Sequence, residues 1–289
     1  MVDLIVEQNF AGTRDGVTQL QRRWRPADSD SDGAGGGGDG PRSAVLLVHG
    51  IGEHSGRYDH VGRFLAGRGH DVMAFDARGH GQSGGRRGFV ESFDEFLDDV
   101  EDLVVERRQL GAPVVLFGHS LGGLVASTYV VGGRPAPDLL VLSSPALRAV
   151  VPKWQTALAP MLSKVTPKLF IKSDFDPAIL ADDAEVQAAY MDDPLRVGGA
   201  TARLGHEVFQ AMASTSASLS RITMPTYVLH GTADELVPVA VSQPLEELDN
   251  VTYRPWTGLR HECLNEPSHQ DVLDELETWL TKQLDAHQA

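Results

Sequence analysis

A serine between two glycines, placed where an apolar run meets a helix-like segment, constrains this fold most. Gly118-His119-Ser120-Leu121-Gly122 follows the apolar residues 114–117 and precedes a segment that favours a helix. So sharp a turn strains the serine backbone, and glycines two residues to either side leave room where strand and helix nearly touch. The pattern predicts a nucleophile elbow that holds the Ser120 hydroxyl above a sheet. The alternative is an ordinary glycine-rich turn.

Apolar runs and helix-like segments alternate along the chain. Unbroken apolar runs such as residues 44–48 are typical of strands covered on both faces. Alternating strands and helices predict an α/β fold with a mostly parallel central sheet flanked by helices, and its chemistry collects at the carboxyl ends of the strands. Strands are expected at residues 44–48, 72–75, 114–117, 139–143, 226–230 and 251–254, and helices near 58–67, 93–109 and 268–284.

Two segments near the start of the chain lie outside this alternation. Residues 3–26 predict two short strands, polar enough for the edge of a sheet. Residues 28–42 have almost nothing apolar to bury, which predicts a flexible loop. Alternating aspartates at 28–32 suggest a calcium loop, but no glutamate closes it and no helices flank it. With no H-E-x-x-H or paired-cysteine spacing either, we assign no metal and no cofactor.

Residues 146–198 break the alternation between two core strands, directly above the end of the sheet that carries the elbow. The stretch is helical in character but contains five prolines. We expect a cap, or lid, inserted between a first core part, residues 1–145, and a second, residues 199–289. Its apolar stripe either packs the cap onto the core, or lines an acyl pocket or enters a membrane surface. The stripe comprises Val151, Trp154, Leu158, Met161, Leu162 and Val165.

The composition of the chain limits the binding partners and the cellular compartment that we expect. A chain of 289 residues with 40 acidic and 25 basic side chains has a formal net charge of −15. We see no basic cluster that offsets this charge, which argues against binding nucleic acid or anionic membranes through electrostatics. The single cysteine, Cys263, excludes an internal disulfide and suits a reducing compartment. Without a signal peptide or an apolar run of ~18 residues, we expect a soluble cytoplasmic protein, with peripheral membrane contact left open.

A serine nucleophile needs a base and a group that orients the base. The acid should follow the fifth core strand, where Asp234 is the candidate, Glu235 its rival and a turn or capping aspartate the structural alternative. The base should follow the last strand, where His261 is the candidate. Other histidines, such as His230, are expected to be structural or solvated. We expect the side chain of His119 to point away from the site.

An ester carbonyl gains negative charge during attack, so backbone N–H groups must already point at its oxygen. The residue after the serine, Leu121, should provide one donor. The loop after the first core strand should provide the second, and Ile51 is the candidate because Gly50 and Gly52 let the backbone approach the ligand. His49, in the same loop, is better explained as a buried structural histidine.

Taken together, six motifs that run in order from about residue 44 to 280 resemble the monoacylglycerol lipases of the α/β-hydrolase fold, especially the bacterial ones. They are His49-Gly50-Ile51-Gly52-Glu53-His54, Asp76-Ala77-Arg78-Gly79-His80-Gly81-Gln82-Ser83, the elbow, Tyr190-Met191-Asp192-Asp193-Pro194-Leu195, His230-Gly231-Thr232-Ala233-Asp234 and His261-Glu262-Cys263-Leu264-Asn265-Glu266. One departure is Leu121, where some relatives carry methionine, but only its backbone is needed.

The resemblance implies a serine hydrolase that cleaves monoacylglycerols to a fatty acid and glycerol, with a cap that contacts membranes or lipid aggregates. It also implies that Glu53, Arg57 and Tyr190 lie near the glycerol-binding end of the site. The structural alternatives are a surface ion pair for Arg57 and cap packing for Tyr190. The sequence leaves the oligomeric state open.

Other functions fit parts of the same pattern. The nearest rivals among enzymes are a lysophospholipase and a broad short-chain carboxylesterase. A dehalogenase or epoxide hydrolase with an aspartate nucleophile is disfavoured because serine occupies the elbow. An inactive hydrolase-fold binding protein is disfavoured because Ser120, Asp234 and His261 are all present in the expected order.

Overall fold

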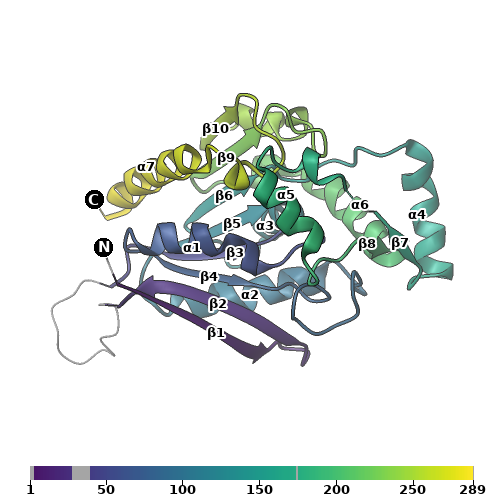
Figure 1. The fold of residues 1–289 in the computed structure, drawn as a ribbon, viewed down its shortest axis with the longest axis horizontal. Coiled ribbons are helices and arrows are strands. Elements are labelled where there is room, and N and C mark those ends of the chain that lie inside the picture. Colours follow the sequence, from purple (N-terminus) through teal and green to yellow (C-terminus); the bar gives the residue numbers. More distant parts are fainter. Residues whose placement is uncertain (1–2, 28–39, 174, 289) are drawn as a thin grey trace.

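The computed structural model describes residues 3–27, 40–173 and 175–288. Most of the expected loop at 28–42, with its calcium-loop alternative, lies outside the described residues. One eight-stranded sheet runs through the molecule with helices on both faces (Figure 1). Its strands, in spatial order, are β1 (Leu4–Gly12), β2 (Thr18–Pro26), β4 (Asp71–Phe75), β3 (Ala44–Val48), β5 (Val114–His119), β6 (Leu139–Ser143), β9 (Thr226–Gly231) and β10 (Val251–Trp256).

The sheet is parallel except at one edge. Six neighbouring strands run in the same direction: β4, β3, β5, β6, β9 and β10. In contrast, β2 is antiparallel to both β1 and β4. The expected edge strands and the expected core strands are therefore all present, with ends that differ by one or two residues. The α/β prediction is confirmed.

Two apolar clusters cover the two faces of the sheet. Successive side chains of a strand point to opposite faces, so Leu46 of β3 packs with one cluster and Leu47 with the other. One face carries α2 (Asp94–Arg108), α3 (Leu121–Val131) and α6 (Ala202–Ser216), and the other carries α1 (Asp59–Ala66) and α7 (His269–Gln288). Burial on both faces explains why the core strands are continuous apolar runs.

Between β6 and β9 the chain leaves the sheet. Residues 146–198, which we call the cap, hold α4 (Lys153–Val165), β7 (Phe170–Lys172) and α5 (Ala184–Asp192). The next strand, β8 (Gly199–Thr201), pairs with β7 in a separate antiparallel sheet. Helix α4 packs on α6 and lies at the end of the molecule away from both termini (Figure 1).

Short 3-10 helices complete the described elements: η2 (Ser55–Tyr58), η3 (Pro177–Ile179), η4 (Leu219–Arg221), η5 (Val239–Val241), η6 (Gln243–Glu247) and η7 (Cys263–Asn265). Of the helices in the described ranges, none combines the length and the apolar character that crossing a bilayer requires.

Candidate active site

The turn between β5 and α3 holds Ser120 in a strained conformation. Its backbone has φ 52° and ψ −114°, a combination that residues with a Cβ rarely adopt. A Cβ at Gly122 would overlap the carbonyl oxygen of Val48, and one at Gly118 would overlap the carbonyl of Gly122. Only glycine fits where strand and helix come this close, so the sequence pattern of the elbow follows from backbone contact.

Asp234, which follows β9, is buried and bonded to the imidazole of His261. Its Oδ2 accepts a hydrogen bond from His261 Nδ1 at 2.7 Å, and its Oδ1 accepts from the backbone N–H groups of Leu236 and Val237. Because the Nδ1 proton points at the carboxylate, Nε2 of a neutral His261 is left to accept a proton. The rival acid, Glu235, is exposed.

A second histidine shares this carboxylate. His230 Nε2 lies 3.0 Å from Asp234 Oδ2 and 2.7 Å from the Val237 carbonyl, while its Nδ1 lies 2.7 Å from Ser242 Oγ. Two acceptors at Nε2 place the proton there. Burial raises the pKa of Asp234, but hydrogen bonds from His230 and His261 outweigh it and hold that pKa well below its ordinary value. Asp234 therefore stays ionised at neutral pH.

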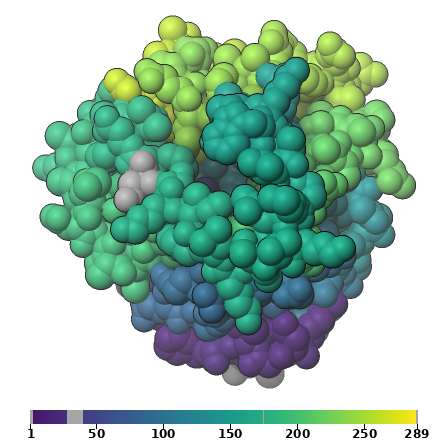
Figure 2. Space-filling model, turned by 90° about the vertical axis from the view of Figure 1, so that its right-hand side faces the viewer, coloured from purple at the N-terminus to yellow at the C-terminus, as the bar shows by residue number. Residues whose placement is uncertain are grey.

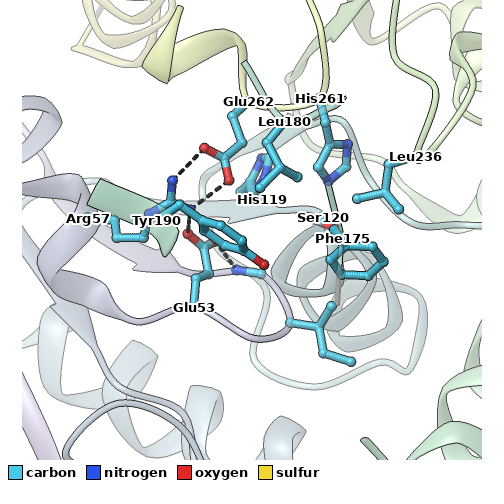
Figure 3. Close-up of a pocket in the computed structure, with 12 residues that line it drawn as sticks. Glu53, Arg57, His119, Ser120, Phe175, Leu180, Tyr190, Leu236, His261 and Glu262 are labelled. Atoms are coloured by element: carbon cyan, nitrogen blue, oxygen red, sulfur yellow. Dashed lines mark hydrogen bonds and ion pairs between the residues drawn. The ribbon is translucent and has the colours of Figure 1, made fainter. Parts of the chain in front are cut away.

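The loop that carries His261 is tied to the strand next to the elbow. Ser144 donates its hydroxyl to the His261 carbonyl at 2.8 Å and its N–H to the Leu229 carbonyl at 2.9 Å. Ser144 also has a positive φ, 43°, so two neighbouring strands both end in strained serines. Ser120 and His261 line one pocket (Figure 3). With the described residues the Ser120 hydroxyl forms no hydrogen bond; such bonds often tighten only when substrate binds.

The expectation for His119 is wrong, because its side chain lines this pocket. Its ring centroid lies 4.9 Å from that of His261, and its Nδ1 lies 3.0 Å from Ser143 Oγ. The reason is strand alternation: His119 points to the same face of β5 as Phe117, and the His261 loop crosses the end of that face. Burial and then the nearby His261 lower the pKa of His119 to about 4, so it is neutral.

The two expected oxyanion donors have N–H groups that no other described residue accepts. Leu121 is the first residue of α3, whose initial N–H groups have no partner within the helix. In the described part of the chain, no acceptor is recorded for the N–H of Leu121 or of Ile51. His49, two residues before Ile51, is buried: its Nε2 accepts from the Ala77 N–H and its Nδ1 donates to the Gly50 carbonyl, so its role is structural.

A buried charge cluster forms the polar end of the pocket. Arg57 bonds Glu53 at 2.9 Å and both carboxylate oxygens of Glu262 at 2.6 and 2.7 Å. Glu53 also accepts from the Tyr58 hydroxyl and the Gly50 N–H. Burial would raise the pKa of Glu53, but Arg57 and the nearby histidines lower it to about 2. The Arg57 side chain is only 11% exposed, which excludes the surface ion pair. Sequence reasoning did not identify Glu262.

Tyr190 of α5 closes the polar end. Its ring centroid lies 5.2 Å from the guanidinium carbon of Arg57 and 4.8 Å from that of Arg196, within range of cation–π attraction. The structure thus brings Glu53, Arg57 and Tyr190 into the pocket that holds Ser120 (Figure 3).

On the other side of Ser120 the pocket is apolar and continues toward α4. Phe175 and Ile51 line both the Ser120 pocket and a neighbouring cavity of about 210 Å³. That cavity shares Phe209 and Ala200 with a groove of about 260 Å³ under α4. We call this series of adjoining apolar spaces, from Ser120 to the outer part of the cap, the apolar route. Its outer walls include Trp154, Leu158, Leu162 and Ile171.

Comparison with known proteins agrees with this geometry. The model of a serine hydrolase family, Hydrolase_4 (serine aminopeptidase, S33), matches residues 39–268. A monoacylglycerol lipase of Mycolicibacterium smegmatis is 35% identical over 96% of this chain and 98% of its own length. The chain belongs to this family of α/β-hydrolase-fold serine hydrolases.

Two further members of the family bear on the substrate. The crystal structure of Paleococcus ferrophilus monoacylglycerol lipase superposes with a TM-score of 0.79 at 31% identity, covering 96% of this chain and 99% of that one. A phospholipase of Bacillus subtilis, YtpA, is 32% identical over 80% of this chain and 92% of its own length. The family thus includes enzymes named for two kinds of lipid ester.

Proposed function

We propose that this chain hydrolyses the ester bond of monoacylglycerols and releases a fatty acid and glycerol. The observation that carries the proposal is a pocket with a polar end at Glu53, Arg57 and Tyr190 and an apolar route on the other side of Ser120. A single-chain ester of glycerol has this division between a small hydroxylated group and one long acyl chain. Its ester carbonyl would lie between the two, beside Ser120.

The reaction would proceed in two acyl-transfer steps. Ser120 Oγ attacks the ester carbonyl while His261 Nε2 takes the hydroxyl proton, and Asp234 stabilises the imidazolium that forms. The N–H groups of Ile51 and Leu121 bind the carbonyl oxygen as it becomes negative. His261 then protonates the departing glycerol oxygen. Water attacks the acyl-enzyme by the same route, which releases the fatty acid and restores the Ser120 hydroxyl.

The charge of the polar end favours glycerol over a phosphate headgroup. Among the described residues that line the pocket, Glu53 and Glu262 face one guanidinium, that of Arg57, which is bonded to both, so this lining is net negative. Arg196, which lies 4.8 Å from the Tyr190 ring centroid, is not one of the lining residues. An uncharged hydroxyl can donate to Glu53. A phosphodiester would bring a further negative charge to a buried anionic cluster, which costs free energy unless a cation moves to meet it.

We also propose that residues 146–198 act as a cap, inserted between core parts 1–145 and 199–289, that contacts lipid aggregates or membranes. The apolar groove under α4 supports this role, because a chain leaving an aggregate would enter it directly. Cys263 is buried and free, which is consistent with a cytoplasmic location.

A substrate panel tests the proposal. The chain and its Ser120→Ala variant are compared on monoolein, a diolein, lysophosphatidylcholine and a short-chain p-nitrophenyl ester. We expect the highest kcat/KM for monoolein and no turnover above background by the variant. Unimpaired hydrolysis by the variant would contradict the assignment of Ser120. A clear preference for lysophosphatidylcholine would support a phospholipase, the activity for which the YtpA relative is named.

A further inference from the structure

Basic residues gather in one part of an acidic chain. Four of the five lysines lie between residues 153 and 172, and residues 144–173 contain one arginine but no aspartate or glutamate. The whole chain has a formal net charge of −15. The expectation that no basic cluster offsets the acidity is therefore wrong for this segment. The negative net charge of the whole chain obscured the positive charge of residues 144–173.

The same segment exposes large apolar side chains. Helix α4 presents Trp154, Leu158, Met161 and Val165 along one stripe, with exposed fractions of 62%, 41%, 55% and 72%. Leu169, Phe170 and Ile171 of the following turn and β7 are also 40% or more exposed. The opposite side of α4, at Ala159 and Ser163, is buried where the helix packs on α6. The stripe is therefore much more exposed than the side of α4 that packs on α6.

Four lysines flank this apolar surface. Lys153, Lys164, Lys168 and Lys172 are all exposed. Within the described residues, none of their ammonium groups forms an ion pair or a hydrogen bond. Of the acidic cap residues that the structure describes, Asp176 follows β7 as the N-cap of η3. The others, Asp182, Asp183, Glu185, Asp192 and Asp193, lie in or next to α5, which is well separated from α4 (Figure 1).

We propose that this basic apolar face, residues 148–172, docks the protein on lipid surfaces that carry anionic headgroups. The lysine ammonium groups would bind headgroup phosphates while their stems and the α4 stripe enter the layer below, as expected for an interfacial amphipathic helix. The acidic remainder of the molecule would be repelled, which orients the docked protein with α4 toward the lipid. The inference rests on the proposed function only in naming the surface that supplies the substrate.

The position of the groove fits this orientation. Its walls include Trp154, Leu158 and Leu162 of α4, and its far end joins the cavity that reaches Phe175 beside Ser120. In Figure 2, which faces this side of the molecule, the teal residues of the cap stand at the front. A lipid leaving the surface would therefore enter the apolar route without crossing the acidic exterior.

Vesicle binding tests the proposal without any hydrolysis. The Ser120→Ala variant of the full chain is mixed with phosphatidylcholine vesicles, or with vesicles of which about a third is phosphatidylglycerol, and bound protein is separated by flotation. Each basic residue near an anionic surface contributes roughly fivefold to binding. We expect at least about tenfold tighter binding to the anionic vesicles, weakened by added salt. Equal binding to both vesicles, or none to either, would overturn the proposal.

Charge variants in the same background locate the surface. Changing Lys153, Lys164, Lys168 and Lys172 together to glutamine should remove the preference for anionic vesicles, whereas changing all four to arginine should keep it. Lys282→Gln, at the fifth lysine on α7, is the matched control and should bind like its parent. An unchanged preference in the glutamine variant, with thermal unfolding also unchanged, would overturn the proposal. Equally tight binding to soluble heparin would also overturn it, because it would show a polyanion site without a lipid component.

Activity separates this inference from the proposed function. In the wild-type background, the glutamine variant should hydrolyse a soluble p-nitrophenyl ester at the normal rate but lose activity on monoolein dispersed in anionic vesicles. If monoolein is not a substrate, the binding experiments still decide whether the face docks on lipid.

Discussion

The two halves of the cap differ in how they are held. In the near half, residues 175–193, Leu180 and Ala181 are buried. This half is bonded to the His261 loop, because Leu180 accepts the Glu262 N–H and Glu266 accepts the Asp182 N–H, both at 2.8 Å. In the far half, residues 150–172, apolar side chains and lysines face outward. The near half is therefore fixed against the loop that carries His261, whereas the far half carries the surface for which we propose lipid contact.

The largest effect is expected from changing Asp234, which bonds the His261 side chain beside the near half. Asp234→Asn should lower kcat on a soluble ester by about 10⁴-fold, because an amide favours the wrong tautomer of His261. Glu235→Gln, one residue away and exposed, is the matched control and should leave the rate unchanged. A loss of less than about tenfold in Asp234→Asn would contradict the assigned role.

Substitutions at two glycines compare how the elbow and helix α6, which follows the cap, tolerate an added methyl group. Gly122→Ala should destabilise the protein by about 3 kcal/mol, because the added methyl overlaps the Val48 carbonyl in β3. Gly205→Ala in α6 meets no atom within 4 Å and should stabilise by about 0.5–1 kcal/mol through helix propensity. Denaturant unfolding measures both. Equal stabilities for the two variants would mean that the elbow tolerates a side chain.

Replacing Arg57 tests the buried charge cluster that lies next to Tyr190 of the near half. Because the pKa of Glu53 is lowered to about 2, its contribution to stability is present above its ordinary pKa of 4.5 and is lost as the pH falls toward 2. In Arg57→Gln the buried Glu53 and Glu262 lose their cation, so their pKa values rise above the ordinary value. The variant should then lose stability as the pH rises toward neutrality.

The expected loss for Arg57→Gln at neutral pH is about 3 kcal/mol, because two buried carboxylates remain unpaired. Arg63→Gln, which breaks an exposed pair with Asp59 on α1, should cost under about 1 kcal/mol and show no such pH dependence. Thermal unfolding across the pH range checks both. A parallel pH profile for wild type and Arg57→Gln would show that Arg57 does not hold the carboxylates.

The smallest effect sharpens the contrast between the two halves directly. Leu180→Ala in the near half removes a side chain that is 4% exposed and should cost about 2 kcal/mol. Leu158→Ala in the far half removes one that is 41% exposed and should cost about 0.5 kcal/mol. If the Leu158 variant lost as much stability, its side chain would be part of the core and unavailable for lipid contact.

Much of the fold was predictable because its signals are local. The apolar runs of β3 and β6 and the glycines of the elbow are short patterns whose cause is burial or backbone contact within a few residues. The acid and base candidates follow from their positions after particular strands. The comparison between Asp234 and Glu235 needed the structure, because only burial and the direction of the carboxylate separate neighbouring acids.

Other features of the site depend on contacts between distant segments. Glu262 meets Arg57 across 205 residues of sequence, and His230 shares Asp234 with His261 only because a turn brings both to one carboxylate. The direction of the His119 side chain depended on which face of β5 the His261 loop crosses. The lysines of the far half were visible in the sequence. Only the structure shows that they are exposed and form no ion pair with the described acidic residues.

Labelling with a fluorophosphonate tests the central claim most directly, that Ser120 is an activated nucleophile at the junction of the polar and apolar ends of one pocket. Mass spectrometry of the intact chain, followed by peptide mapping, should find a single adduct, on Ser120, whose formation monoolein slows and whose mass shift is absent in Ser120→Ala. An adduct on another residue, or labelling that persists in the variant, would contradict the account.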